Sequence, residues 1–215
     1  MPGVDAGILC SNLSKGLHAA AQPLAILRAS LGTQEIERMS RDELQELATS
    51  SAMHVERVCI LYSCIEQLVT TEIVEPQLTP TPIVPLILDV MDRVRCIFED
   101  NGMSLNLQVS DTSQPVLIHT GRTMEALSIV LLIAYAVSSA PDGIELIVSR
   151  TPANKVRVVV QNQNSQVDVL EAEASLRMDI ADADIRSQRA SFSWSLHPFV
   201  VQIDLPKAPP SYRCL

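Results

Sequence analysis

The chain has 215 residues, of which 47% are hydrophobic and 19% charged, so it is globular and not disordered. Its net charge of −9 argues against binding to a nucleic-acid backbone, which requires clustered Lys and Arg. The chain begins without a basic segment followed by an apolar run, and its longest apolar stretch, residues 126–140, is too short to span a bilayer, so we expect a soluble cytoplasmic protein.

Two helices are predicted in residues 1–75. In the first, apolar residues recur at alternating spacings of about four and three from Leu13 to Leu31, which is typical of a helix in a bundle, and Gly32 follows in a C-cap position. In the second, Ser40 or Asp42 supplies the N-cap. The seam of that second helix consists of Leu44, Ala48, Ser51, Val55, Val58, Tyr62, Ile65 and Val69. An antiparallel helical hairpin cannot bury this seam alone, so we expect it to form a dimeric four-helix bundle, and therefore a homodimer.

Prolines then interrupt the helical pattern, and residues 76–82 are interpreted as a linker. Beyond it, helices are expected at 84–100, closed by Asn101 and Gly102, and at 122–140, with a weaker candidate at 167–178. Strands are expected at 104–109, 116–119, 144–149 and 156–161, and a closing hairpin at 191–196 and 199–205. This order predicts an α+β sandwich over residues 83–206, with helices on one face of a mixed sheet, and a flexible tail at 207–215.

The most specific motif lies on the first helix, where residues 17–24 are Leu-His-Ala-Ala-Ala-Gln-Pro-Leu. If Leu17 and Leu24 occupy the seam, His18 points to solvent, where a neutral imidazole can act as a nucleophile. Pro23 removes a backbone donor inside the helix and leaves a free carbonyl near the histidine. The segment resembles the phosphoacceptor box of sensor histidine kinases, one form of which reads His-Glu-Leu-Asn-Gln-Pro-Leu, and it matches that form at His18, Gln22, Pro23 and Leu24.

The resemblance implies the fold and the role of each part. A dimerisation and phosphoacceptor hairpin, a proline-containing linker and an ATPase-like α/β sandwich follow one another in the order of that family. His18 is then the phosphoacceptor, and Lys15, Gln22, Pro23 and Arg28 are candidate supporting residues for the receiver contact or the phosphoryl group.

The sequence departs from the family wherever ATP chemistry requires a particular residue. Ala19 stands where family kinases place an acidic residue as a base. The helix over 122–140 has Ile133 and Ala134 where the family has a magnesium-binding asparagine. The family's Asp-x-Gly-x-Gly motif corresponds to residues 158–165, where Asn162 replaces the aspartate and no glycine remains, since all seven glycines lie at or before Gly143. We therefore expect a degenerate domain that binds no nucleotide cofactor.

These observations favour a histidine phosphotransferase in a two-component phosphorelay. His18 would carry a phosphoryl group between receiver-domain aspartates without using ATP, and Mg²⁺ would come from the receiver. The partners implied are response-regulator receiver domains and an upstream hybrid kinase, with no nucleic acid and no membrane. The alternative is an inert pseudokinase adaptor that dimerises and docks a receiver or a kinase; retention of His18 favours chemistry over that alternative.

Other polar residues receive structural interpretations. We expect His54 to be a partly buried structural residue, His119 to contact a helix N-terminus and His197 to lie in a turn. The acidic residues of segment 171–184 are interpreted as a solvated face: Glu171, Glu173, Asp179, Asp182 and Asp184. The five scattered cysteines form no CxxC pair, which predicts buried reduced thiols and no metal site.

Overall fold

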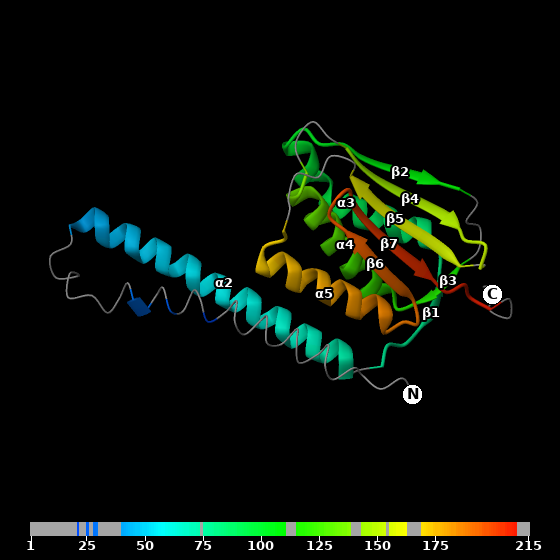
Figure 1. Ribbon diagram of the computed structural model, residues 1–215, viewed down its shortest axis with the longest axis horizontal. Helices are drawn as coiled ribbons and strands as arrows, with labels where there is room; N and C mark the ends of the chain where they lie inside the picture. The colour runs from blue at the N-terminus through cyan, green and yellow to red at the C-terminus, as the bar shows by residue number, and fades with distance from the viewer. Residues whose placement is uncertain are drawn as a thin grey trace. The chain divides into compact units, whose positions relative to one another are not determined.

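The computed structural model describes residues 21, 25, 28, 29, 40–73, 75–110, 115–138, 143–153, 155–162 and 169–209. The chain divides into two compact units, Met1–Thr70 with Glu171–Leu176 and Thr71–Leu170 with Arg177–Leu215. The described part of the first unit consists mainly of one long helix, and the second is a sandwich of helices and a sheet (Figure 1). None of the described helices has the length and apolar character needed to cross a membrane.

The long helix, α2 (Arg41–Ile73), begins at a capping box. The Ser40 backbone N–H donates to Glu43 Oε2 at 2.7 Å, and the Glu43 N–H donates to Ser40 Oγ at 3.3 Å. The hydrogen bond from the Ser40 backbone lowers the pKa of Glu43. Of the two N-cap candidates, Ser40 is therefore the residue that starts the helix.

The sheet of the sandwich has five strands in the order β2-β4-β5-β7-β6. β2 (Leu105–Val109) pairs in parallel with β4 (Ile144–Arg150), and the other neighbours are antiparallel: β5 (Val156–Asn162), β7 (Phe199–Leu205) and β6 (Ser191–Ser195). Strands β4, β5 and β7 alternate strictly between buried and half-buried residues, so one face of the sheet forms the core.

Helices α3 (Ile83–Asp100) and α4 (Thr120–Ala136) lie together against the core face of the sheet, as Figure 1 shows. The core is aliphatic because aromatics make up only 3% of the chain. Its largest fully buried side chains include Phe98, Phe199, Ile83, Ile87, Ile118, Leu127 and Leu131. Burial of each such side chain contributes about 1.5–3 kcal/mol, so packing of this core is the main stabilising term that the sandwich has against the entropy of the unfolded chain.

Helix α3 ends where the sequence predicted, at Asn101 and Gly102. Gly102 adopts a φ of 66°, and its N–H donates to the Glu99 carbonyl at 3.1 Å. The Met103 N–H reaches back to the Phe98 carbonyl at 3.0 Å, which completes a Schellman motif. The Met103 and Phe98 side chains line one small cavity of about 50 Å³ beside β2.

A second, small sheet ties three distant segments together. β1 (Thr79–Thr81) lies within the stretch interpreted as a linker and pairs antiparallel with β3 (Val116–Ile118). The Leu117 N–H donates to the Pro206 carbonyl at 2.8 Å, so the chain after β7 also joins β3. No sequence pattern predicted β1, since three residues with Pro80 at their centre do not show a periodicity.

The expected mixed α+β sandwich is confirmed, and its elements lie close to the predicted ones. The main difference is α5 (Ala172–Arg186), which begins later and runs further than the helix expected at 167–178. Buried residues continue through its second half: Met178, Ile180, Ala181 and Ile185. The predicted hairpin partner of α2 falls mostly outside the described residues, so the four-helix bundle and the homodimer stay predictions.

Candidate functional site

The phosphoacceptor box lies almost wholly beyond the described part of the chain. His18, Lys15, Gln22 and Pro23 are outside the described residues. Arg28 is helical and exposed. The described residues therefore do not test how the predicted site residues are arranged, and their roles remain predictions.

The described helix α2 carries an apolar stripe on its surface. Leu44, Val55 and Tyr62 belong to the predicted seam, and they are 40%, 47% and 67% exposed. Three further seam residues, Val58, Ile65 and Val69, are half-buried. Large apolar side chains at seam spacing and open to solvent mark a helix face that favours a packing partner.

In the sandwich, helix α4 occupies the place where the resemblance puts a magnesium-binding asparagine. Ile133 is 4% exposed and Ala134 is completely buried, so both contribute to the core. The neighbouring Tyr135 ring packs edge-on against Phe98, with centroids 5.3 Å apart. Aliphatic side chains at this point supply no oxygen ligand for Mg²⁺.

The end of β5 holds the residue that corresponds to the family's adenine-binding aspartate. Asn162 is 2% exposed, and its Nδ2 donates to Ser138 Oγ, just beyond the end of α4. Ser138 Oγ in turn donates to the Ala134 carbonyl at 2.5 Å. The amide of Asn162 is thus part of a neutral, part-buried hydrogen-bond chain between β5 and the end of α4.

The described glycines have structural roles. Gly102 adopts the left-handed turn after α3. At Gly143, a Cβ would lie 2.4 Å from Ser104 Oγ, so a side chain there requires the Ser104 hydroxyl to move. Neither glycine follows β5, where a phosphate-binding loop would require one.

A buried polar cluster, which we call the Gln188 cluster, joins the start of α4 to the end of α5. Gln188 is fully buried, and its Oε1 accepts from the His119 N–H at 2.7 Å and from Thr123 Oγ1 at 3.0 Å. Its Nε2 donates to the Asp184 carbonyl at 2.7 Å. Arg122 approaches the buried Asp184 carboxylate to 3.9 Å. The cluster is a structural joint, and sequence reasoning missed it because its members are distant along the chain.

Two of the remaining histidines have the predicted structural roles. His119 is the N-cap of α4, where its Nδ1 accepts from the Arg122 N–H at 3.2 Å. His197 lies in the turn between β6 and β7. His54 lies on α2, but its side chain falls outside the described residues, so its burial stays a prediction.

The acidic segment is only in part the solvated face that was expected. Asp184 is 1% exposed and faces Arg122, whereas Asp182 bonds to Arg186 on the next turn of α5. Burial raises the pKa of Asp182, and the hydrogen bond from Arg186 opposes that shift. The prediction of a solvated face was wrong for Asp184 because an ion pair with another helix compensates its burial.

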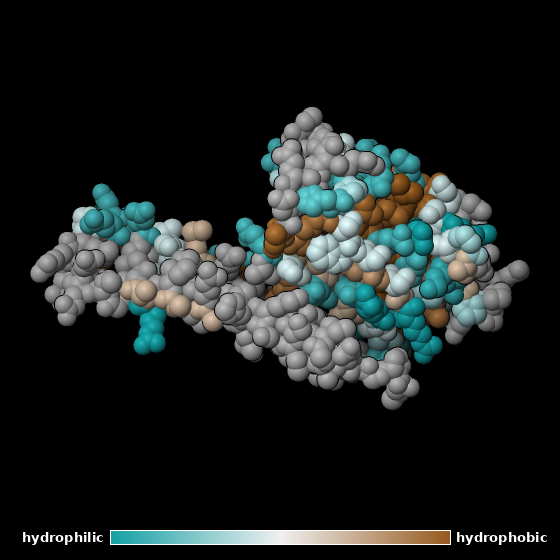
Figure 2. All heavy atoms as spheres, in the orientation of Figure 1, coloured by the Kyte–Doolittle hydropathy of each residue, from teal (hydrophilic) through white to brown (hydrophobic). Residues whose placement is uncertain are grey.

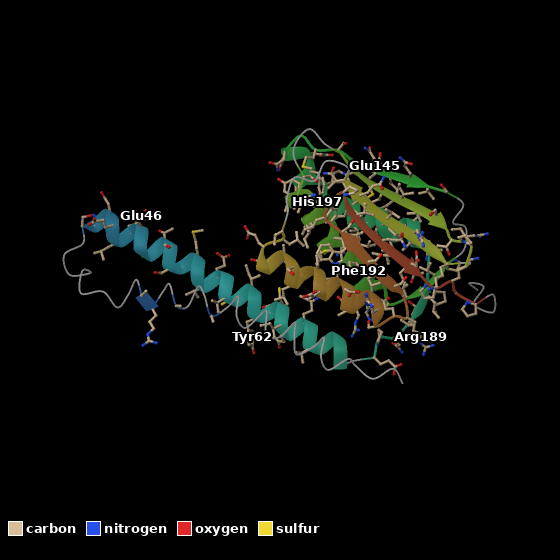
Figure 3. All side chains as sticks on the ribbon, in the orientation of Figure 1. Glu46, Tyr62, Glu145, Arg189, Phe192 and His197 are labelled. Carbon is tan, nitrogen blue, oxygen red and sulfur yellow. The ribbon has the colours of Figure 1, made fainter. Side chains whose placement is uncertain are left out.

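The cysteine prediction also needs correction. Cys59 and Cys96 are exposed, and Cys64 is buried, so only one of these three thiols has the expected burial. Within the described ranges, no three His, Cys, Asp or Glu side chains converge as metal ligands would. Figure 3 shows the described side chains on the ribbon.

No protein-family model and no curated protein matches the sequence. Solved structures do match. The histidine kinase AdeS of Acinetobacter baumannii is 15% identical, covering 89% of this chain and 98% of its own, with a TM-score of 0.67. A structure of histidine kinase ThkA in complex with the response regulator protein TrrA is 13% identical, covering 97% of this chain and 64% of that chain, with a TM-score of 0.71.

The catalytic domain of ThkA alone also matches, with a TM-score of 0.53 over 60% of this chain and 95% of that domain, at 15% identity. At identities this low, the likeness is one of fold. The described sandwich has the fold of a histidine kinase catalytic domain. It keeps that fold without the polar residues at the positions of Ile133 and Ala134 or an acidic residue at Asn162.

Proposed function

We propose that this chain is a histidine phosphotransferase in a two-component phosphorelay and not an ATP-dependent kinase. The proposal rests on one observation. The sandwich has the fold of a histidine kinase catalytic domain, but other residues stand at the positions where the resemblance places the ATP-binding ones. There, Ile133 and Ala134 are buried in the core, and the Asn162 amide is bonded to Ser138. A domain of this fold that offers no magnesium ligand and no adenine-reading carboxylate needs another source of phosphoryl groups.

A receiver-domain phosphoaspartate is such a source. In the proposed step, a neutral ring nitrogen of His18 attacks the phosphorus, the bond between phosphorus and the aspartyl oxygen breaks, and the carboxylate leaves with its electron pair. The imidazole N–H proton is released or shared with a nearby acceptor. Transfer to a second receiver is the reverse reaction. Mg²⁺ bound by the receiver neutralises the phosphoryl oxygens, so the chain itself needs no metal. Lys15, Gln22 and Arg28 are proposed to contact the receiver or the phosphoryl group, and Pro23 to shape the helix beside His18.

The proposal includes a homodimer built on the helical hairpin. The exposed stripe of α2, with Leu44, Val55 and Tyr62 at seam positions, supports it, because pairing two hairpins removes this apolar surface from water. The partners proposed are receiver domains and an upstream hybrid kinase, in the cytoplasm. The structure of ThkA with response regulator TrrA supports a response-regulator partner.

The alternative is an inert adaptor that has the same fold and partners but performs no chemistry. Ala19 favours this alternative, since no carboxylate adjoins His18 to help remove the imidazole proton. Transfer from phosphoaspartate has a weaker need for that base, because an acyl phosphate is a more reactive phosphoryl donor than ATP. We therefore favour the phosphotransferase over the adaptor, because the chain retains His18.

The test is a transfer assay with purified full-length chain and radiolabelled, phosphorylated receiver domains from the same genome. We expect label to appear on the wild type and not on His18→Ala. Ala19→Ser is the matched control, because it changes the neighbouring position without touching the nucleophile. If receivers bind the protein but none loses label to it, the adaptor function replaces the phosphotransferase.

A further inference from the structure

Among the strands that the structure describes, β6 is the last of the sheet, and none of them pairs with its outer edge. Exposed edge strands in soluble proteins are normally protected by Lys, Pro, a bulge or a covering element, because their free backbone groups pair readily with other chains. β6 has the sequence Ser-Phe-Ser-Trp-Ser and carries none of these residues. Its three serines are exposed, and Trp194 is 40% exposed although its partner across the ladder, Val201, is completely buried.

The side chain of Arg186, at the end of α5, bonds to this strand. Arg186 Nη2 donates to the Phe192 carbonyl at 3.2 Å, while Arg186 Nε bonds to Asp182 on its own helix. A carbonyl of β6 that a helix side chain binds is directed away from β7. Since backbone groups alternate along an antiparallel strand, the N–H and C=O of Trp194 are directed to the same free edge.

The Arg186 side chain therefore occupies part of the outer edge of β6, and an incoming strand can displace it. This side chain is 61% exposed, so the guanidinium can rotate away with a small loss of packing. Its partner Asp182 is only 32% exposed, so the mobile member of this ion pair is the arginine. A second cation, Arg189, is exposed just before β6. The other carboxylate nearby, Asp204, lies opposite Ser191 and is held by Arg157 at 2.7 Å.

We propose that the free edge of β6 is a strand-addition site for an extended, acidic segment of a partner protein. The incoming strand pairs with the backbone of Phe192 and Trp194. An apolar side chain opposite Trp194 packs on the indole, and an acidic side chain two residues away binds Arg186 in place of Asp182. Charge complementarity fixes the partner's chemistry, because exposed Arg186 and Arg189 flank this edge in a chain whose net charge is −9. The site consists of sandwich residues alone and does not depend on the proposed role of His18.

The experiment uses the full chain and a fluorescence readout specific to the site, because Trp194 is the only tryptophan. The probes are short blocked peptides that alternate valine and threonine and carry one glutamate two residues from a valine. In one peptide the glutamate precedes that valine, and in the other it follows it. With at least one of the two peptides, we expect the Trp194 emission to shift to shorter wavelength and the shift to saturate. The same peptide N-methylated on the backbone nitrogens that face β6 should not bind.

Two variants should change the affinity in opposite directions. Asp182→Asn releases Arg186 from its own helix, so the peptide should bind several-fold more tightly. Arg186→Gln removes the cation, so binding should weaken about tenfold, and replacing the peptide glutamate by glutamine should then have no further effect. General damage to the fold would weaken both variants, which separates it from the proposed mechanism.

Three results with the peptides and variants would overturn the proposal, and a fourth needs no peptide. They are an unchanged emission with every peptide, equal binding of the N-methylated peptide, and a change of the same sign in both variants. A Trp194 emission that depends on protein concentration without peptide would also overturn it, because it would show that the edge pairs with a second copy of the chain. The N-methylation comparison needs only the unmodified protein, so it decides even if a variant fails to fold.

Discussion

Placing an aspartate at the end of β5 is the sharpest test of our proposal that the sandwich binds no nucleotide. If the domain still bound ATP weakly, Asn162→Asp would return the family's adenine-reading residue and improve binding. The structure predicts the opposite. Asn162 is 2% exposed and donates to Ser138 Oγ, whose own proton is used by the Ala134 carbonyl. A carboxylate in this place loses the amide donor of Asn162, and it can keep the Ser138 contact only if the hydroxyl turns its proton away from the Ala134 carbonyl.

The cost follows from two contributions. An unsatisfied buried polar group costs about 1–3 kcal/mol, and burial of a carboxylate without a partner adds to it, so we expect a loss of about 3 kcal/mol at neutral pH. Burial also raises the pKa of the new carboxyl, so the penalty is present above that raised pKa and is relieved as the pH falls through it. Urea denaturation across pH measures both effects. Asn162→Leu is the control, because it removes the donor without adding a charge.

Calorimetry with ATP and Mg²⁺ completes the test. We expect no heat of binding with wild type or with Asn162→Asp, and no rise in Tm. A ligand at one hundred times its Kd would stabilise the folded state by about 2.7 kcal/mol, which a thermal scan detects easily. A variant as stable as wild type that also binds ATP would refute our interpretation of this position.

Three further changes test the packing of the sandwich. Gln188→Ala leaves three buried groups without their partner, so unfolding free energy should fall by about 3 kcal/mol in urea titration; a loss under about 0.5 kcal/mol would contradict the cluster. Asp182→Asn should raise Tm above the raised pKa of Asp182, where wild type bears a buried charge, and the gain should vanish at acid pH, where the wild-type carboxyl is protonated; a gain that persists in acid would point to another cause. Gly143→Ala should lower Tm by several degrees, since its Cβ would lie 2.4 Å from Ser104 Oγ, and Ser104→Ala in the same chain should restore most of that loss.

The sheet could be predicted from sequence because its signals are local. β4 and β5 alternate apolar residues at every second position, and the core face of each follows directly from that alternation. α3 was equally clear, since Asn101 and Gly102 supply a stop that needs no tertiary contact. These elements account for most of the sandwich.

The misplaced elements depend on contacts between distant residues. α5 has a weak apolar pattern because Asp184 occupies a core position that Arg122 of another helix compensates, and such a pairing leaves no local trace. β1 exists only through β3. The contact of Arg186 with Phe192 is likewise a product of the folded chain. The segment around His18 is the opposite case. The sequence alone identified it as a candidate phosphoacceptor box, and His18 lies outside the described residues.

The proposed loss of nucleotide chemistry is physically compatible with retention of the fold. Figure 2 shows hydrophobic residues over the sandwich, and the buried side chains form its core. Active sites often carry strained or unsatisfied groups, whereas Ile133 and Ala134 are packed in the core and Asn162 bonds to Ser138. If the domain performs no nucleotide chemistry, as we propose, its contribution lies in what its surfaces bind. The outer edge of β6, where Arg186 bonds to the Phe192 carbonyl and Trp194 is partly exposed, is the surface to test first.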